Sequence, residues 1–147
     1  MKLSDVISCV RGDVVAARPV TAVATDTVQS VAGRMREHNV GAIVIVEGRK
    51  PMAMVTDRDL ALAIAEPGFD PNESVKTVMR TPVRTLPDGA GIFSATQCMR
   101  DAGVRRMAVV DKEGNLIGIA SFDDLLQLIV GELHNLAQGV KNELKVK

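Results

Sequence analysis

The first half of the chain alternates between helical and strand patterns of hydrophobic residues. Residues 19–24 predict a short strand after a proline. Within residues 27–38 the apolar positions recur three and four residues apart, which predicts a helix with one buried face. Residues 43–46 form a β-branched apolar run too short for a helix, so we expect a buried strand there. Another strand ends near Val55, and a helix begins at Thr56.

This order of patterns occurs twice. Residues 82–130 repeat the pattern of residues 19–65, and Pro82-Val83 corresponds to Pro19-Val20. The second copy has its own helical stripe within residues 92–99 and its own short apolar run at residues 107–110. One copy is too small to bury its apolar face well alone, so the copies are expected to pack together. The predicted fold class is α/β (α+β), with two tandem β-α-β-β-α units.

We expect four segments along the chain. Residues 1–66 form a first domain, with a lead-in and an unmatched insert at about residues 8–18. Residues 67–81 form a turn-rich linker, in which residues 74–80 could add one helical turn. Residues 82–135 form the second domain, and residues 136–147 extend its last helix.

The last helix has an unusually long apolar stripe. Its apolar residues recur at three- and four-residue steps well beyond the point where the first copy stops, at Pro67. Gly131 and Gly139 weaken it as an isolated helix, so we expect it to pack against something. The residues of the stripe are Leu125, Ile129, Leu133, Leu136, Val140 and Leu144.

Composition narrows the class of partner. Apolar residues make up 46% of the chain and charged residues 24%, as in an ordinary packed protein. Eighteen basic residues balance eighteen acidic ones, and there is no Trp or Tyr, which disfavours nucleic-acid binding. No apolar run could span a bilayer, and the first residues do not resemble a signal peptide. We therefore expect a cytoplasmic protein with no nucleic-acid or membrane partner.

The residues that most often carry catalysis or bind metals are sparse. Cys9 and Cys98 have no CxxC partner, so no zinc site is predicted, and Cys98 is expected to be buried in the core. His38 and His134 are isolated and expected at the surface. No catalytic triad or phosphate-binding glycine loop is present, which predicts a protein that is not an enzyme. A thiol-dependent enzyme that uses Cys98 or Cys9 is the alternative.

The most specific motif occurs where each copy's last strand meets its last helix. Residues 118–124 read Gly-Ile-Ala-Ser-Phe-Asp-Asp, and residues 53–59 read Ala-Met-Val-Thr-Asp-Arg-Asp. With these motifs the chain resembles a CBS domain pair, the tandem module named after cystathionine β-synthase. The family pattern is Gly-apolar-x-Thr/Ser-x-x-Asp, and the first copy departs from it only by having Ala53 in place of glycine. The resemblance implies two domains related by a pseudo-twofold axis.

The residues alone allow two interpretations of the Thr/Ser-x-x-Asp motif. Thr56 with Asp59, and Ser121 with Asp124, are capping boxes that could do no more than begin helices. The same geometry could bind a nucleotide, because a helix N-terminus favours anions and a hydroxyl can donate to a phosphate. A carboxylate can also accept hydrogen bonds from the two vicinal hydroxyls of a ribose. The resemblance favours this second interpretation.

The resemblance also implies which residues complete two clefts. The cleft with Thr56 and Asp59 would be completed by residues of the second copy, and the cleft with Ser121 and Asp124 by residues of the first. Four arginines could bind phosphates or could simply form a solvated basic edge. If they converge, the Thr56 cleft should prefer phosphorylated ligands. The completing residues are Arg84, Val104 and Arg105 for the first cleft and Thr21, Val40 and Gly41 for the second; the arginines are Arg58, Arg84, Arg105 and Arg106.

The resulting hypothesis is a regulatory or sensor module that signals to an unidentified partner protein. The resemblance implies an adenosine-containing ligand, namely AMP, ADP, ATP, S-adenosylmethionine or NAD, with or without Mg²⁺, and no tightly bound cofactor. It also implies a homodimer, to which the long last helix could contribute. The alternative is a dimerisation scaffold whose clefts bind no ligand.

Overall fold

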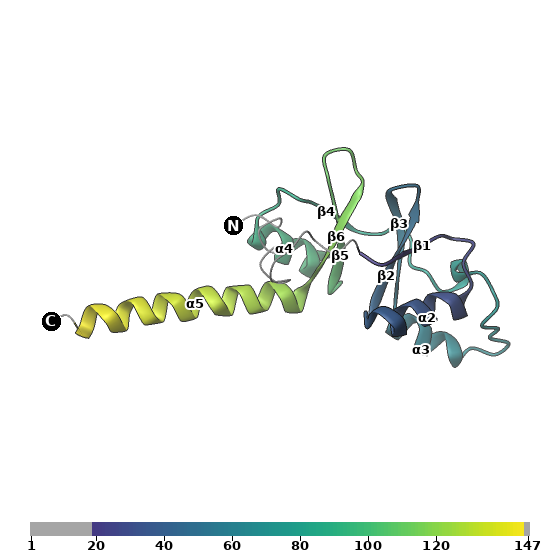
Figure 1. The fold of residues 1–147 in the computed structure, drawn as a ribbon, viewed down its shortest axis with the longest axis horizontal. Helices are drawn as coiled ribbons and strands as arrows, with labels where there is room; N and C mark the ends of the chain where they lie inside the picture. Colours follow the sequence, from purple (N-terminus) through teal and green to yellow (C-terminus); the bar gives the residue numbers. More distant parts are fainter. Residues whose placement is uncertain (1–18, 146–147) are drawn as a thin grey trace.

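The computed structural model describes residues 19–145. The insert predicted at residues 8–18 and the cysteine at position 9 lie outside the described residues. The described part consists of two units, each a three-stranded sheet with helices packed on it, and of a long helix that extends from the second unit (Figure 1).

The first unit contains five elements in the predicted order. They are β1 (Thr21–Ala22), α2 (Val28–His38), β2 (Ala42–Glu47), β3 (Lys50–Thr56) and α3 (Asp57–Ile64). The sheet order is β1-β2-β3, with β1 parallel to β2 and β2 antiparallel to β3. A helix connects the parallel pair, as this pairing requires, and a tight turn connects the antiparallel pair.

The second unit repeats this arrangement. It contains β4 (Thr85–Pro87), α4 (Ile92–Ala102), β5 (Arg106–Val110), β6 (Leu116–Ser121) and α5 (Phe122–Lys145). Its sheet order, β4-β5-β6, has the same parallel and antiparallel pairings. The predicted fold class and internal duplication are therefore confirmed.

Helix boundaries follow the local chemistry of the sequence. The Thr27 side chain accepts a hydrogen bond from the Ser30 amide at the start of α2. Asn39 ends α2 and Gly103 ends α4, both with left-handed backbones (φ of 51° and 63°). In both helices the cap amide donates to carbonyls of the last turn. The predicted helix ends are thus observed.

Each unit has its own apolar core, and a third cluster joins the two sheets. Ala42, Val44 and Met54 of the first sheet pack with Ala108 of the second. The β2-β3 and β5-β6 hairpins lie next to each other (Figure 1), and the Leu116 amide donates to a carbonyl of the β2-β3 turn at 2.8 Å. This contact buries apolar sheet surface that each unit would expose by itself.

The linker pairs with the edge of the first sheet before it enters the second unit. It contains the three-residue 3₁₀ turn η1 (Val75–Thr77), shorter than the predicted turn. After it, Arg80 and Met54 exchange backbone hydrogen bonds of 3.0 and 3.2 Å. Farther on, the Val83 amide donates to the Met52 carbonyl at 3.1 Å. The linker backbone is thereby fixed along β3.

Helix α5 is the continuous long helix that was predicted, but its far half is not covered by the described residues. Figure 1 shows it running past α4 and away from the body of the protein. The side chains of Val130, Leu133, Leu136 and Val140 are between 55% and 68% exposed. The first turns of α5 pack on the core of the second unit through Leu125, Leu128 and Ile129, whereas no packing of its far half is found within the described chain. None of the described helices combines the length and apolarity needed to cross a membrane.

One expectation about the core is wrong. Cys98 is exposed, whereas we expected it to be buried. The buried residues of α4 are Ile92, Ala95 and Met99, and Cys98 lies about a quarter turn from the centre of that stripe. Met99, the next residue along the chain, faces the core instead of Cys98. Both histidines are exposed, as expected.

Two glycine-to-alanine substitutions should change stability in opposite directions. Gly103→Ala forces alanine into a left-handed backbone and should lower the free energy of unfolding by about 1 kcal/mol. Gly33→Ala lies inside α2 and should raise it by about 0.5–1 kcal/mol. A Cβ at either position meets no atom within 4 Å, so backbone preference alone separates them. Urea denaturation measures the free energy of unfolding of both variants. Equal changes in the two variants would contradict the left-handed backbone at Gly103 and the helical one at Gly33.

Candidate functional site

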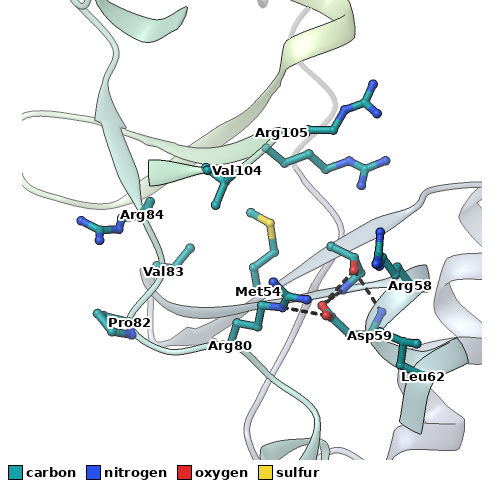
Figure 2. A pocket seen from close by; sticks show the side chains of 13 residues that line it. Met54, Arg58, Asp59, Leu62, Arg80, Pro82, Val83, Arg84, Val104 and Arg105 are labelled. Atoms are coloured by element: carbon teal, nitrogen blue, oxygen red, sulfur yellow. Dashed lines mark hydrogen bonds and ion pairs between the residues drawn. The ribbon is translucent and has the colours of Figure 1, made fainter. Parts of the chain in front are cut away.

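A cavity of about 410 Å³ lies between the two units (Figure 2). This volume is within the range of roughly 300–1,000 Å³ that is usual for small-molecule sites. The first unit contributes the end of β3 and the start of α3, and the second contributes the loop between α4 and β5. The linker forms the remaining wall. The lining residues are Met54, Thr56, Arg58, Asp59, Leu62, Arg80, Pro82, Val83, Arg84, Gly103, Val104, Arg105 and Arg106.

Thr56 and Asp59 form a complete capping box at the start of α3. The Thr56 amide donates to Asp59 Oδ2 at 2.9 Å, and the Asp59 amide donates to Thr56 Oγ1 at 3.2 Å. The Thr56 hydroxyl also donates to Asp59 Oδ2, at 2.8 Å. The structural role considered for this motif is therefore present. In this arrangement the hydroxyl proton points to the carboxylate, so the hydroxyl would have to rotate to donate to a phosphate.

Asp59 also forms an ion pair with the linker. Arg80 Nε donates to Asp59 Oδ1 at 2.7 Å. The Asp59 side chain is only 6% exposed, whereas that of Arg80 is 69% exposed. Among the described residues, Asp59 is the one polar or charged residue that is buried. Its carboxylate reaches the cavity beside Arg80 (Figure 2). A buried carboxylate with an exposed cationic partner is thus the central polar feature of this cavity.

The opposite wall comes from the second unit. Gly103 ends α4 in a left-handed conformation, and the chain turns through Val104 and Arg105 into β5. The Phe122 amide donates to the Arg105 carbonyl at 2.8 Å, which ties this turn to the start of α5. The Arg105 guanidinium forms an exposed ion pair with Asp123 at 2.7 Å and lies 5.9 Å from the centre of the Phe122 ring.

The lining of the cavity is strongly basic although the chain as a whole is neutral. Five arginines and one carboxylate, Asp59, line it. Figure 2 shows Arg58 and Arg84 on opposite sides of the view, with Met54 and Val83 between them. The basic side chains therefore surround an apolar floor. Such an arrangement suits a ligand with a flat apolar part and an anionic group.

The structure brings together every residue predicted for the Thr56 cleft. Thr56, Arg58, Asp59, Arg84, Val104 and Arg105 all line the cavity, together with Arg106. Sequence reasoning missed Arg80. Arg80 lies in the linker, outside the two matched copies, so the repeat does not assign it to a cleft. The one available signal was its position just before Pro82-Val83, where the second copy begins. Its pairing with Met54 is what brings it to Asp59.

The Ser121 motif is placed differently. Ser121 Oγ donates to Asp124 Oδ2, and the Asp124 amide donates to Ser121 Oγ at 3.1 Å, so the cap is repeated. The 410 Å³ cavity includes neither residue. A Cβ on Gly41 would approach the Arg106 guanidinium and the Asp57 carboxylate to 3.1 Å each. The side chain of a second-unit arginine therefore reaches the position that we had assigned to the Ser121 cleft.

The other two residues assigned to the Ser121 cleft have structural contacts. The Thr21 carbonyl accepts a hydrogen bond from Arg34 at 2.9 Å. Val40 packs against the core of the first unit. Neither contact by itself indicates a ligand, so their assignment to a binding site stays a prediction.

The sequence match to a family model settles which family this is. The CBS domain model matches twice, at residues 10–66 and 75–131. The chain belongs to the CBS domain family. The two units described above are therefore a CBS domain pair, and the cavity lies between its two domains.

Relatives of this CBS domain pair are known in bacteria and archaea. The CBS domain-containing protein YhcV of Bacillus subtilis is 36% identical over 113 residues, which cover 77% of this chain and 78% of YhcV. An uncharacterized protein of Methanopyrus kandleri is 36% identical over 119 residues, 80% of this chain. The match spans 61% of that relative's length.

A solved structure has the same fold. It is a CBS domain protein from Pyrobaculum aerophilum complexed with AMP. The TM-score is 0.77 and the sequence identity 26%, over 92% of this chain and 99% of the other.

Proposed function

We propose that this protein is a regulatory module that binds an adenine nucleotide in the cavity between its two CBS domains. The observation that carries the proposal is the convergence of the Thr56–Asp59 pair with five arginines on one cavity of about 410 Å³. The complex of the Pyrobaculum aerophilum relative with AMP supports it. We retain the predicted domain division at residues 66, 81 and 135 as part of this proposal.

The chemistry of the cavity walls supports one orientation of the proposed ligand. Asp59 would accept hydrogen bonds from the ribose hydroxyls, and the guanidinium groups would bind phosphate oxygens. Met54, Val83 and Val104 would contact the adenine ring. At the second motif the counterparts of Arg84 and Arg105 are Thr21 and Gly41, so that motif has fewer cations, although Arg106 reaches Gly41. We therefore assign the phosphorylated ligand to the Thr56 site.

Signalling would follow from the ligand's contacts with both domains. Thr56 and Asp59 belong to the first domain, and Val104 and Arg105 belong to the second. A ligand that contacts both sides stabilises the relative orientation in which both contacts are made, and so shifts the population toward it. A partner protein that binds that orientation would sense the ligand. We propose binding without turnover, so the nucleotide should be recovered unchanged after incubation with the protein.

Asp59→Asn should weaken adenine-nucleotide binding at least tenfold. The reason is the loss of charge-assisted hydrogen bonds to the ribose, each worth about 1.5–3 kcal/mol. Asp124→Asn is the matched control, since it changes the equivalent carboxylate outside the cavity, and should leave this binding unchanged. Calorimetric titration with AMP, ADP and ATP, with and without Mg²⁺, measures both.

Two results would contradict the proposal. Unchanged binding by Asp59→Asn would mean that the carboxylate acts only as a helix cap. The absence of heat and of thermal stabilisation with AMP, ADP, ATP, NAD and S-adenosylmethionine would favour the alternative of a ligand-free scaffold.

A second candidate function, dimerisation, is favoured by helix α5. Its apolar residues at positions 126, 129, 133, 136 and 140 follow alternating steps of three and four residues, which is the spacing of a helix–helix seam. An isolated helical segment with two interior glycines is marginal in water. We propose that α5 of a second copy packs on this face.

Leu133→Gln combined with Leu136→Gln should shift the protein toward the monomer. Both side chains are at least 60% exposed in a single chain, so their replacement removes the proposed seam without disturbing the core. His134→Ala with Gln138→Ala, on the polar side of α5, is the control and should leave the mass unchanged. Light scattering coupled to gel filtration gives the masses. A parent protein that is already monomeric, or a double variant that stays dimeric, would contradict this role for α5.

A further inference from the structure

Arg80 donates a hydrogen bond to Oδ1 of Asp59, one of the two carboxylate oxygen atoms that could accept hydrogen bonds from a ribose. We infer that Arg80 holds Asp59 while the cavity has no nucleotide and moves to the phosphates when a nucleotide binds, so that Arg80 makes the site select nucleotides over nucleosides. This inference depends on the proposed function, because it concerns the same cavity. It adds the specificity-determining residue and the class of ligand that the residue selects.

The first step is the acceptor capacity of the Asp59 carboxylate. An ionised carboxylate offers about four lone-pair positions. Oδ2 accepts two hydrogen bonds, from the amide and the hydroxyl of Thr56, and Oδ1 accepts one from Arg80 Nε. About one position remains free. Two vicinal hydroxyls of a ribose bring two donors, so one of the present partners must leave.

The second step is which partner leaves. The bond from the Thr56 amide belongs to the capping box of α3, and both Thr56 bonds are made to Oδ2, not to Oδ1, the oxygen that Arg80 contacts. The Arg80 side chain is 69% exposed, so water can solvate its guanidinium as soon as it leaves Asp59. The ribose hydroxyls would replace Arg80 as donors to Oδ1, so the buried carboxylate would not be left without a partner. Arg80 is therefore the partner that a ribose displaces.

The third step is where the guanidinium goes. The Arg80 backbone stays fixed by its two hydrogen bonds with Met54, so only the side chain has to move. Arg80 lines the same cavity as Arg58, Arg84, Arg105 and Arg106. A phosphate group there gives Arg80 a new anionic partner in exchange for Asp59. An unphosphorylated adenosine displaces Arg80 without offering such a partner.

The selectivity follows from this exchange. With adenosine, binding includes the cost of breaking the Arg80–Asp59 pair. With AMP or ADP, a charge-assisted contact to phosphate offsets that cost. Removal of the Arg80 charge should consequently strengthen adenosine binding and weaken nucleotide binding. A purely structural role of Arg80 would change both affinities in the same direction.

The experiment compares adenosine and AMP on Arg80→Gln and on the parent protein by calorimetric titration. For Arg80→Gln we expect adenosine to bind about two- to fivefold more tightly, because adenosine no longer has to displace a charged partner from Asp59. We expect AMP to bind about tenfold more weakly, the equivalent of one hydrogen bond to a charged group. Arg80→Lys keeps the charge without the planar fork and should fall between the parent and Arg80→Gln for AMP.

The control is Arg100→Gln. Arg100 is an exposed arginine of α4 paired with Asp101 outside the cavity, and its replacement should change neither affinity. If Arg80→Gln changes adenosine and AMP affinity by the same factor, or changes neither, the inference about Arg80 is wrong while the proposed function stands. If the parent protein binds adenosine as tightly as AMP, the inference is wrong; if it binds neither compound, nor ADP, ATP, NAD or S-adenosylmethionine, the proposed function fails and the inference fails with it.

Discussion

The packing of the two sheets against each other is the contact on which the rest of this molecule depends. Ala42, Val44 and Met54 of the first domain meet Ala108 of the second, and this contact removes from water apolar surface that one small domain cannot cover by itself. The same contact brings the end of β3, with Thr56, opposite the loop that precedes β5. The cavity is therefore a consequence of how the duplicated unit buries its second apolar face.

The fold could be predicted because its signals are local and occur twice. Each short apolar run, each helix stripe and each helix end at Asn39 or Gly103 is encoded within a few residues. The walls of the Thr56 cavity were also within reach, because the family resemblance assigned equivalent positions in the two copies. Arg80 was not, because its place depends on the linker pairing with β3, and no local pattern of residues 67–81 specifies that pairing. Cys98 shows the same limit on a helix, where a position at the edge of a stripe does not reveal its burial.

The cleft at Ser121 stays a prediction, and the side chains around the two motifs differ. The duplication gives both domains the same backbone, but four of the five arginines at the Thr56 cavity have no basic counterpart. Arg58, Arg84, Arg105 and Arg106 correspond to Asp123, Thr21, Gly41 and Ala42. The symmetric backbone thus carries an asymmetric charge distribution. Five arginines line the cavity of the Thr56 motif; among them Arg80 pairs with Asp59, and Arg105 pairs with Asp123.

This asymmetry has a consequence for a sensor. A ligand changes the balance between two domain orientations only by the difference in its affinity for them. Asp59 is fixed to the first domain by its cap, whereas Arg84, Arg105 and Arg106 belong to the second. A nucleotide with its sugar at Asp59 and its phosphates at these arginines would connect the two domains through its charged end, and that contact would weaken as they separate. A nucleoside lacks this end and would connect them mainly through its base. The phosphate, rather than the adenine, would then carry most of the difference in affinity that the module could report to a partner.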